Sequence, residues 1–212
     1  MAGDSARLKG RQAQAALNDE AILAAAREVF LADPAAPIAA VAERAGVGIG
    51  ALYHRYDSKE ELLRTLCANG QQVYVAKIEK ALASDGEPWM VFTDYLRRIV
   101  AANTHGLTVR LAGLFTPSAA QLEVAERMRA LSIELFERVR DAGELRADVT
   151  YLDIEYLLEF LASVRLGDAQ RSAELRQRHL AVIMDGLHSS QPTPLPGRPP
   201  TWEEQTARWI TR

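Results

Sequence analysis

The 212-residue chain has a single cysteine, Cys67, and no long apolar run. One cysteine excludes a disulfide within the chain and fits a reducing compartment, so we expect Cys67 to be a small buried side chain on a helix. No apolar stretch approaches the roughly 20 residues that cross a bilayer, and we expect no membrane partner. The first residues lack the apolar segment of a secretory signal, which predicts a cytoplasmic protein.

The chain also has little positive charge to offer to a polyanion. Its net charge is -3, which argues against a general nucleic-acid binder coated in lysine. Arg7, Lys9 and Arg11 concentrate some basic charge at the beginning of the chain, whereas acidic residues cancel the basic ones between Asn18 and Glu60. DNA affinity would therefore have to come from a few placed cations, helix N-termini and dimerisation.

Signatures of catalysis and metal binding are missing as well. The sequence contains no glycine-rich phosphate loop and no nucleophile–base–acid set. Its four histidines are isolated from other residues at metal-ligand spacing. We expect no catalytic residue, no metal and no cofactor, and a small helical enzyme is the least favoured interpretation.

Helical periodicity runs through nearly the whole chain. Strand-like alternation is absent, while Ala, Leu, Glu and Arg dominate, which predicts an all-α fold of about nine helices. Ser58 with Glu61 has the spacing of a capping box, and Ser118 is a second expected cap. Glu123 with Arg127, and Glu134 with Arg138, are expected as surface pairs. The predicted helices span residues 18–32, 38–45, 49–54, 58–83, 88–104, 108–115, 119–142, 152–166 and 169–187, with one or two turns at 202–209 that dock back.

The pattern of a helix-turn-helix lies in residues 41–62, which read VAERAGVGIGALYHRYDSKEEL. Two short helical segments flank a turn at Gly46, where a left-handed cap is expected. The second segment of such a motif lies in the major groove of DNA, and the first crosses behind it. The side chains expected in the core of this region are Ala42, Ala45, Val47, Leu52 and Tyr56.

The second segment predicts which residues contact DNA. Glycines allow the backbone to approach the duplex closely, and the methyl groups of Ile49 and Ala51 can contact thymine. Tyr53 either contacts phosphate or packs on the first helix, and Lys59 with its helix start would clamp a phosphate. Arg55 either contacts DNA or pairs with an acid. The candidate DNA contacts are Gly48, Ile49, Gly50, Ala51, Tyr53, His54, Arg55 and Lys59, with Arg7, Lys9 and Arg11 on the backbone or in the minor groove.

An ordered set of residues within 18–67 resembles the DNA-binding domain of the TetR family of bacterial transcription regulators. These residues are Ala26 and Phe30, then Val41-Ala42-Glu43-Arg44-Ala45-Gly46-Val47, then Leu52-Tyr53-His54-Arg55-Tyr56, and finally Lys59-Glu60-Glu61-Leu62. The segment Leu145–Thr150 before a hydrophobic helix, with Asp185-Gly186-Leu187, is similar to the SbtR-like branch. The sequence departs from the family pattern at Gly48, Ile49 and Ala51, where hydrogen-bonding side chains are common, which shifts weight towards DNA shape.

The resemblance implies a dimeric repressor that binds a palindromic double-stranded DNA operator and leaves it when an unidentified small-molecule effector binds. A constitutive helix-turn-helix protein without an effector is the alternative. The residue pattern predicts an N-terminal arm (1–17) and a proline-rich tail (189–212), and between them the resemblance implies a helix-turn-helix domain (18–65) and a helical ligand-binding and dimerisation domain (66–188).

Two sets of residues are candidates for the functions of the larger domain. The helix at 152–166 is apolar on nearly every side, so a second subunit is expected to cover one face. The candidate dimer residues are Tyr156, Leu157, Phe160, Leu161, Val164, His179, Val182 and Ile183. Aromatic and polar residues of the middle helices line a pocket or form ordinary core, and an inward Arg110 would need an anion from a ligand or a protein acid. The candidate ligand residues are Trp89, Phe92, Tyr95, Leu96, Asn103, Arg110, Phe115, Met128 and Phe136.

Overall fold

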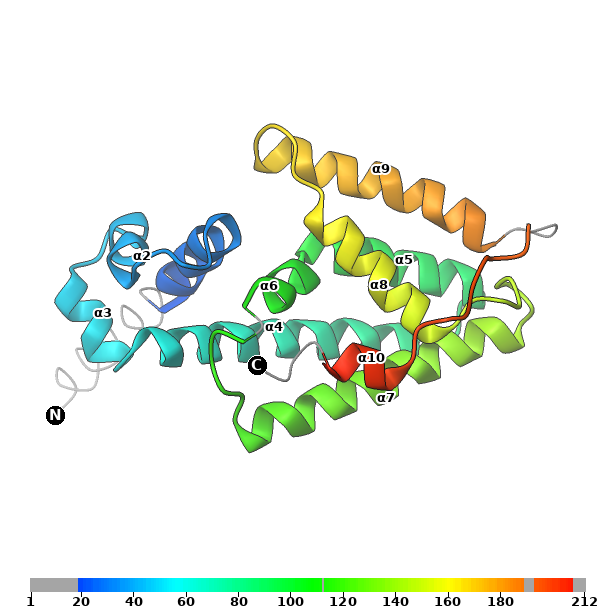
Figure 1. The fold of residues 1–212 in the computed structure, drawn as a ribbon, viewed down its shortest axis with the longest axis horizontal. Helices are drawn as coiled ribbons and strands as arrows, with labels where there is room; N and C mark the ends of the chain where they lie inside the picture. Colours follow the sequence, from blue (N-terminus) through cyan, green and yellow to red (C-terminus); the bar gives the residue numbers. More distant parts are fainter. Residues whose placement is uncertain (1–18, 112, 189–192, 208–212) are drawn as a thin grey trace, which may run out of the picture. The chain divides into compact units, whose positions relative to one another are not determined.

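The computed structural model describes residues 19–111, 113–188 and 193–207, and all secondary structure within them is helical (Figure 1). The prediction of an all-α fold is confirmed. None of the helices in this described part combines the length and apolarity of a membrane span. The helical segments are residues 19–32, α2 (Ile38–Ala45), α3 (Ile49–Arg55), α4 (Lys59–Leu82), α5 (Pro88–Ala102), α6 (Thr104–Leu111), α7 (Ala119–Asp141), α8 (Tyr151–Ser163), α9 (Ala169–Leu187) and α10 (Trp202–Ala207).

The chain forms two compact units. The first, which we call the head, holds the described residues up to Cys67 together with Leu114–Thr116. The second, the body, holds the other described residues from Ala68 onwards. Helix α4 crosses the boundary, so its first turns are part of the head and its later turns are part of the body.

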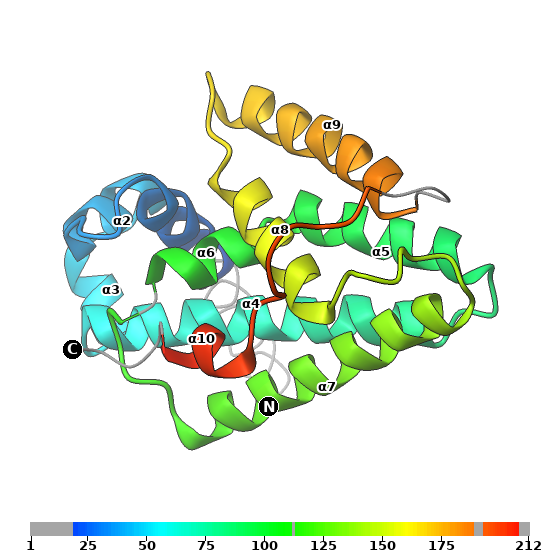
Figure 2. The same cartoon turned by 45° about the vertical axis from the view of Figure 1, so that its right-hand side comes forward.

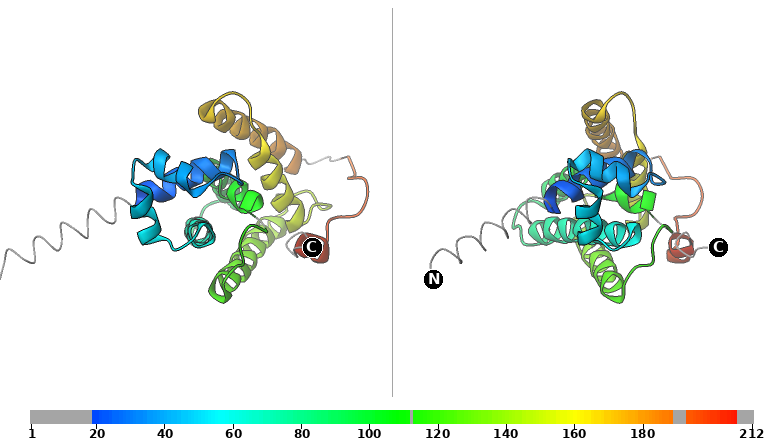
Figure 3. Two further views of the ribbon diagram at one scale, coloured as in Figure 1. Left: turned by 60° about the vertical axis from the view of Figure 1, so that its left-hand side comes forward. Right: turned by 90° about the vertical axis from the view of Figure 1, so that its left-hand side faces the viewer.

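The turn between α2 and α3 depends on Gly46. This residue has φ +67°, and its N–H donates to the carbonyls of Ala42 and Glu43. Glycine adopts this left-handed conformation without the strain that a Cβ would bring, so α2 can end in one residue. The expected cap is confirmed, and residues 19–32, α2 and α3 form a cluster of three short helices (Figure 3).

Side-chain caps start the longer helices. The Ser58 hydroxyl accepts the N–H of Glu61 at 3.1 Å, while the Glu61 carboxylate accepts the N–H of Asp57 at 2.7 Å. The expected capping box thus has its bond from the Glu61 N–H to the Ser58 hydroxyl. The Glu61 carboxylate, however, accepts from the N–H of Asp57 and not from that of Ser58. Ser118 and Gln121 form a complete capping box at α7, which confirms the cap predicted there.

The core of the body lies between the later turns of α4 and helices α5, α7, α8 and α9. Helix α5 contacts α6, α7, α8 and α9, and it lies between α9 and α4 in both Figure 1 and Figure 2. In the head, Cys67 is buried as expected, and burial raises the pKa of its thiol to about 12.

Helix α6 begins four residues before the predicted start. Asn103 ends α5 in the left-handed conformation, with φ 50°, and α6 follows from Thr104. Asparagine is one of the few residues besides glycine that tolerate this conformation, so one residue suffices to redirect the chain. The prediction that one helix reaches residue 104 and the next begins at 108 was wrong for this reason.

Arg138 has a different role from the one expected. Its guanidinium donates to the carbonyls of Leu82 at 3.2 Å, Ser84 at 2.7 Å and Gly86 at 3.3 Å, which lie at the end of α4 and in the turn after it. These carbonyls include acceptors that a helix end leaves unsatisfied. Arg127 pairs with Glu79, so neither of the two predicted pairs along α7 is the one formed.

We expect Arg138→Met to lower the free energy of unfolding by about 1–3 kcal/mol, because three carbonyls lose a charged donor. Arg127→Met removes only an exposed ion pair on the same helix and is expected to change stability by less than about 1 kcal/mol. Urea unfolding followed by circular dichroism measures both. Equal effects of the two variants would contradict a capping role for Arg138.

Candidate nucleic-acid interface and body sites

Helix α3 presents the predicted DNA-contacting residues to solvent. Ile49 is 43% exposed and Tyr53 is 48% exposed, whereas Leu52 between them is fully buried. Gly48, Gly50, Ala51 and His54 are also exposed. The ring of Tyr53 is therefore available for an outside contact. Leu52 and Tyr56 lie in the core of the head, as does Ala42, while Ala45 and Val47 are half-buried.

The two glycines at the start of α3 have empty space beside them. A Cβ added to Gly48 or to Gly50 would meet no atom within 4 Å. Gly48 has φ -67°, which any residue adopts. Since neither packing nor backbone conformation in the head demands glycine at these positions, the bare backbone is left open to a close approach from outside.

Every arginine and lysine of the described head is engaged within the chain. Ion pairs join Arg44 to Glu28, Arg55 to Asp19 and Arg64 to Glu60. Arg27 also has an interaction partner, and burial lowers the pKa of its guanidinium. Of the two alternatives for Arg55, the structure thus forms the acid pair. Because exposed ion pairs are weak, a DNA contact by Arg55 stays a prediction.

Lys59 ties the start of α4 to the loop after residues 19–32. Its ammonium donates to the carbonyls of Ala36 at 2.7 Å and Pro34 at 3.1 Å, and it lies 5.1 Å from the centre of the Phe30 ring. A lysine ammonium has three donors, so one is left for a phosphate. The phosphate contact stays a prediction, but Lys59 also has a structural role that its position in the sequence does not reveal.

The remaining candidate cations of the DNA interface, Arg7, Lys9 and Arg11, lie outside the described residues. With the basic side chains of the described head already engaged, they are the main source of further positive charge near the amino end of the chain.

A buried polar cluster occupies the body. The Tyr74 hydroxyl lies 2.7 Å from Ser132 Oγ and donates to Glu155 Oε1 at 3.5 Å. His105 Nε2 lies 3.1 Å from Glu155 Oε2, and the side chains of this pair are only 13% and 17% exposed. The Tyr95 ring meets Tyr74 edge to face at 6.2 Å. Burial raises the pKa of both tyrosine hydroxyls well above the usual value, so both remain protonated donors.

The structure disperses the predicted ligand residues. Phe92, Leu96 and Phe136 are ordinary buried core, and Met128 packs against that core. The Trp89 ring stacks on the His188 ring, with 4.3 Å between the ring centres, and His188 is not a member of the polar cluster. Phe115 belongs to the head. Tyr95 joins the polar cluster, Asn103 lines a small cavity beside it, and Arg110 is half-buried at the end of α6.

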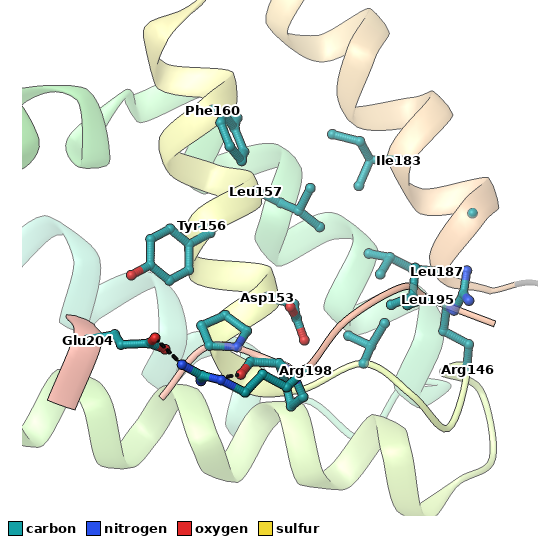
Figure 4. Close-up of a pocket in the computed structure, with 14 residues that line it drawn as sticks. Arg146, Asp153, Tyr156, Leu157, Phe160, Ile183, Leu187, Leu195, Arg198 and Glu204 are labelled. Carbon is teal, nitrogen blue, oxygen red and sulfur yellow. Dashed lines mark hydrogen bonds and ion pairs between the residues drawn. The ribbon is translucent and has the colours of Figure 1, made fainter. Parts of the chain in front are cut away.

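A groove of about 780 Å³ runs along α8 and α9 and is bordered by residues of the tail (Figure 4). Its walls are mainly apolar, with charged side chains at the rim. Arg146 holds the tail by donating to the Thr193 carbonyl at 2.6 Å, and Asp148 accepts the N–H of Leu195 at 2.9 Å. The Arg129 guanidinium lies 4.9 Å from the Trp202 ring, so α10 docks on α7 as expected for the tail.

Most predicted dimer residues lie on this side of the body. Tyr156, Leu157, Phe160 and Ile183 line the groove. Phe160 and Val182 are each 67% exposed, which is unusual for large apolar side chains. His179 is exposed and Val164 is half-buried. Leu161 is the exception, because it is 2% exposed and packs in the core of its own chain, so it is not available to a partner.

Sequence reasoning missed the polar cluster as a unit. Its members come from α4, α5, α6, α7 and α8, and no local motif joins them. One signal was present: Glu155 is an acid near the start of a helix that is apolar on nearly every side. Within the described residues, no group of three or more His, Cys, Asp or Glu side chains is placed to hold a metal.

Family models match both parts of the chain. One described as bacterial regulatory proteins of the tetR family matches residues 22–66, and one described as the C-terminal domain of SbtR-like transcriptional regulators matches residues 87–189. These ranges contain helix α3 and the polar cluster apart from Tyr74.

Individual proteins are similar over most of the chain. The HTH-type transcriptional regulator UidR of Escherichia coli (strain K12) is 29% identical over 182 residues, which are 76% of this chain and 89% of UidR. A TetR transcription regulatory protein from Mycobacterium vanbaalenii is 28% identical, with a TM-score of 0.56, over 84% of this chain and 99% of that one. LfrR from Mycobacterium smegmatis, solved in complex with proflavine, shares the fold at 21% identity, with a TM-score of 0.63 over the same shares.

We expect Lys59→Met to lower the free energy of unfolding by about 1–3 kcal/mol, because the two loop carbonyls lose a charged donor and Phe30 loses its cation. Lys80→Met, at an exposed site on the same helix, is the matched control and should have little effect.

The same variants test the phosphate contact. If Lys59 also contacts phosphate, the slope of log Kd for DNA against log salt should fall by about 0.9. The triple variant R7Q/K9Q/R11Q is the reference for lost phosphate contacts and should lower the slope by about 2–3 if all three bind DNA. An unchanged slope for Lys59→Met would leave Lys59 with a structural role only.

Proposed function

Because the chain belongs to the TetR family of bacterial regulatory proteins, we propose that it is a cytoplasmic dimeric repressor that binds a palindromic operator and leaves it when a small-molecule effector binds. The family and the relatives are transcriptional regulators, so the expectation that the protein is not an enzyme is confirmed. The operator, the dimer and the release by a ligand are the parts that go beyond the family assignment.

The exposed face of α3 is the observation that carries the DNA-binding proposal. Solvent-exposed Ile49, Tyr53 and His54 share that face with two glycines that have empty space beside them. A short helix with a bare backbone at its start suits close approach to the edges of bases, where methyl groups contact thymine. Few hydrogen-bonding side chains remain for bases, so DNA shape is proposed to supply part of the specificity.

The charges of the head suggest that the head and the N-terminal arm contribute differently to DNA binding. Because its described cations are engaged in internal contacts, the electrostatic attraction to phosphate is proposed to come largely from Arg7, Lys9 and Arg11. Backbone N–H groups at helix starts add to it. The head then supplies shape and orientation, and the arm supplies the salt-dependent part of the affinity.

Dimerisation is proposed to occur through the α8–α9 face. Phe160 and Val182 are exposed on this face, and Phe160 lines the groove. In a monomer, water would contact these apolar surfaces. A two-fold axis places the same patch of both subunits in contact, so that each copy covers the other. Two heads held about 34–36 Å apart can enter successive major grooves, which is why a palindrome is expected.

The buried polar cluster is the proposed effector site. A pocket needs a few convergent polar groups among apolar walls, and Glu155, His105 and Tyr95 provide them. LfrR, which shares the fold, was solved in complex with proflavine, and this supports the proposal of a small-molecule effector here. Tyr74 places α4 in this cluster while Lys59 places the same helix in the head, so a ligand that prefers one position of α4 would change DNA binding.

The constitutive alternative differs in one respect. It keeps the head and the dimer but has no ligand that changes DNA affinity. A ligand screen by thermal shift, followed by DNA binding with each hit, separates the two proposals.

Selection of bound sequences from random DNA tests the DNA-binding proposal directly, and a palindrome is the expected product. Gly50→Ala should then weaken binding to the selected site by about tenfold or more, because its methyl group meets the duplex. The same change should stabilise α3 by up to about 1 kcal/mol. Gly70→Ala, at a helical glycine that also has open space, is the matched control and should leave DNA binding unchanged. Recovery of no enriched sequence would contradict the proposal.

The dimer proposal is tested by charge insertion. F160R/V182R is expected to give a monomer by sedimentation, because two buried like charges would face each other across the axis. Met90, which is 62% exposed on α5, gives the matched control Met90→Arg, and this variant should stay dimeric. A dimer that survives both changes would place the interface elsewhere.

A further inference from the structure

The described part of the tail, residues 193–207, follows the last residue that a family model matches. It is nevertheless fastened to the body by its main chain. Arg146 donates to the Thr193 carbonyl at 2.6 Å, and Asp148 accepts the N–H of Leu195 at 2.9 Å. The Arg146 guanidinium and this N–H hold the pKa of Asp148 well below its usual value, so the acceptor stays charged at neutral pH. The first part of the tail therefore has a fixed place on the body.

The second part of the tail is held by side chains. The Thr201 N–H donates to Glu204 Oε2 at 2.9 Å, and the Glu204 N–H donates to Thr201 Oγ1 at 3.3 Å, so these two residues cap the start of α10. Arg198 pairs with the same carboxylate. On α7, the Arg129 guanidinium lies 4.9 Å from the centre of the Trp202 ring. The tail is thus a formed segment with contacts to the body at both of its ends.

These contacts make the tail one wall of the groove along α8 and α9 (Figure 4). The tail lines the groove with Leu195 and the rigid pair Pro199 and Pro200. Leu195 is 45% exposed although it is held by its main chain. The other apolar lining residues are Val149, Leu157, Phe160, Ile183 and Leu187. Without the tail, α8 and α9 would present this apolar surface with one wall missing.

The charged side chains in the lining balance one another. They are two arginines and two acids: Arg146, Arg198, Asp153 and Glu204. In a two-fold symmetric pair the same patch of both copies meets, so a patch with a net charge would repel itself. A groove with apolar walls and balanced charges avoids this repulsion, which makes it compatible with a second copy of the chain.

Exposed apolar side chains beside the groove favour a second copy over a small molecule. Phe160 and Val182, each 67% exposed, have the largest exposed fractions among the large apolar side chains of the described residues. Phe160 lines the groove, and Val182 lies one turn before Gly186, which also lines it. The volume of about 780 Å³ would hold a drug-sized molecule. Such a molecule would leave Val182 in water, whereas a second copy can cover the groove and Val182 together.

We infer that the groove receives the second copy of the chain and that the tail is a structural part of the dimer interface. Leu195 and the two prolines contact the second copy, together with the apolar side chains of α8 and α9. The inference rests on the proposed dimer, to which it adds a segment that lies beyond the matched family domain. Prolines lose little conformational freedom on binding, so this wall costs little to order.

Gly186→Leu in the full-length protein tests whether the groove must stay open. A Cβ on Gly186 would meet no atom within 4 Å, so the new side chain fits its own chain and extends into the groove. We expect the dissociation constant of the dimer, measured by analytical ultracentrifugation, to rise by about tenfold or more, because the side chain occupies space that the second copy needs. Gly70→Leu, at another helical glycine with open space, is the matched control and should dimerise normally.

Leu195→Arg tests the part of the tail. A charge at this position would be buried against the second copy, so we expect the dissociation constant of the dimer to rise by about tenfold or more. Ala207→Arg adds the same charge to an exposed residue of the tail that does not line the groove, and it should leave the dimer unchanged. Circular dichroism and the melting temperature show whether each variant is folded.

Several outcomes would overturn the inference. An unchanged dimer in folded Gly186→Leu or in folded Leu195→Arg would each do so. If F160R/V182R is monomeric in the same experiment, the proposed α8–α9 dimer stands and only the part of the groove and tail in it fails. If Gly186→Leu dimerises normally but no longer binds a compound found in the ligand screen, the groove holds a small molecule, which also contradicts the inference. A monomeric unmodified protein would contradict both the inference and the proposed dimer.

Discussion

The largely buried carboxylate of Glu155 is the constraint on which the packing of the body depends. A carboxylate inside an apolar helix bundle destabilises the fold unless donors surround it. Here Tyr74 and His105 provide those donors from two other helices. The requirement therefore relates α4, α6 and α8 to one another, in addition to the burial of Leu107 and Leu111 on α6 itself.

That constraint gives α4 two kinds of attachment. In the body, Tyr74 is held by a hydrogen-bond network in a region of low polarity, where geometry is strict. In the head, Lys59 is held by loop carbonyls and the Phe30 ring. Helix α4 also packs Ile78 in the apolar core of the body, so polar and apolar contacts hold it together. The proposed release of DNA depends on this attachment in both units.

Helix ends were predictable from the sequence wherever one residue decides them. Gly46, Ser118 and the start of α9 fall where local chemistry places them, because each end is fixed within a turn. The start of α6 was not predictable, since Asn103 is a non-glycine residue in the left-handed conformation and no local motif marks it. The Asn103 side chain also lies close to Gly106, because a Cβ on Gly106 would come within 2.6 Å of Asn103 Oδ1.

The candidate sites also divide into those that a local sequence pattern predicts and those that only the fold brings together. The exposed side of α3 followed from the helix-turn-helix pattern, because Leu52 had to face inward and its neighbours then had to face outward. The polar cluster could not be found, because Tyr74 and Glu155 are 81 residues apart and only the fold brings them together. Phe92 and Phe136 lie in the core of the body, and apolar rings alone do not tell a core from a ligand pocket. The groove beside α8 could not be predicted either, because tail residues form part of its border and hydrophobic periodicity does not predict the path of the tail.

The open space beside Gly48 and Gly50 has an evolutionary consequence. New side chains fit at these positions without repacking the head. If α3 reads DNA as proposed, sequence preference can therefore change there while the stability of the head is kept, whereas most binding surfaces couple these two properties because their contact residues also support the fold.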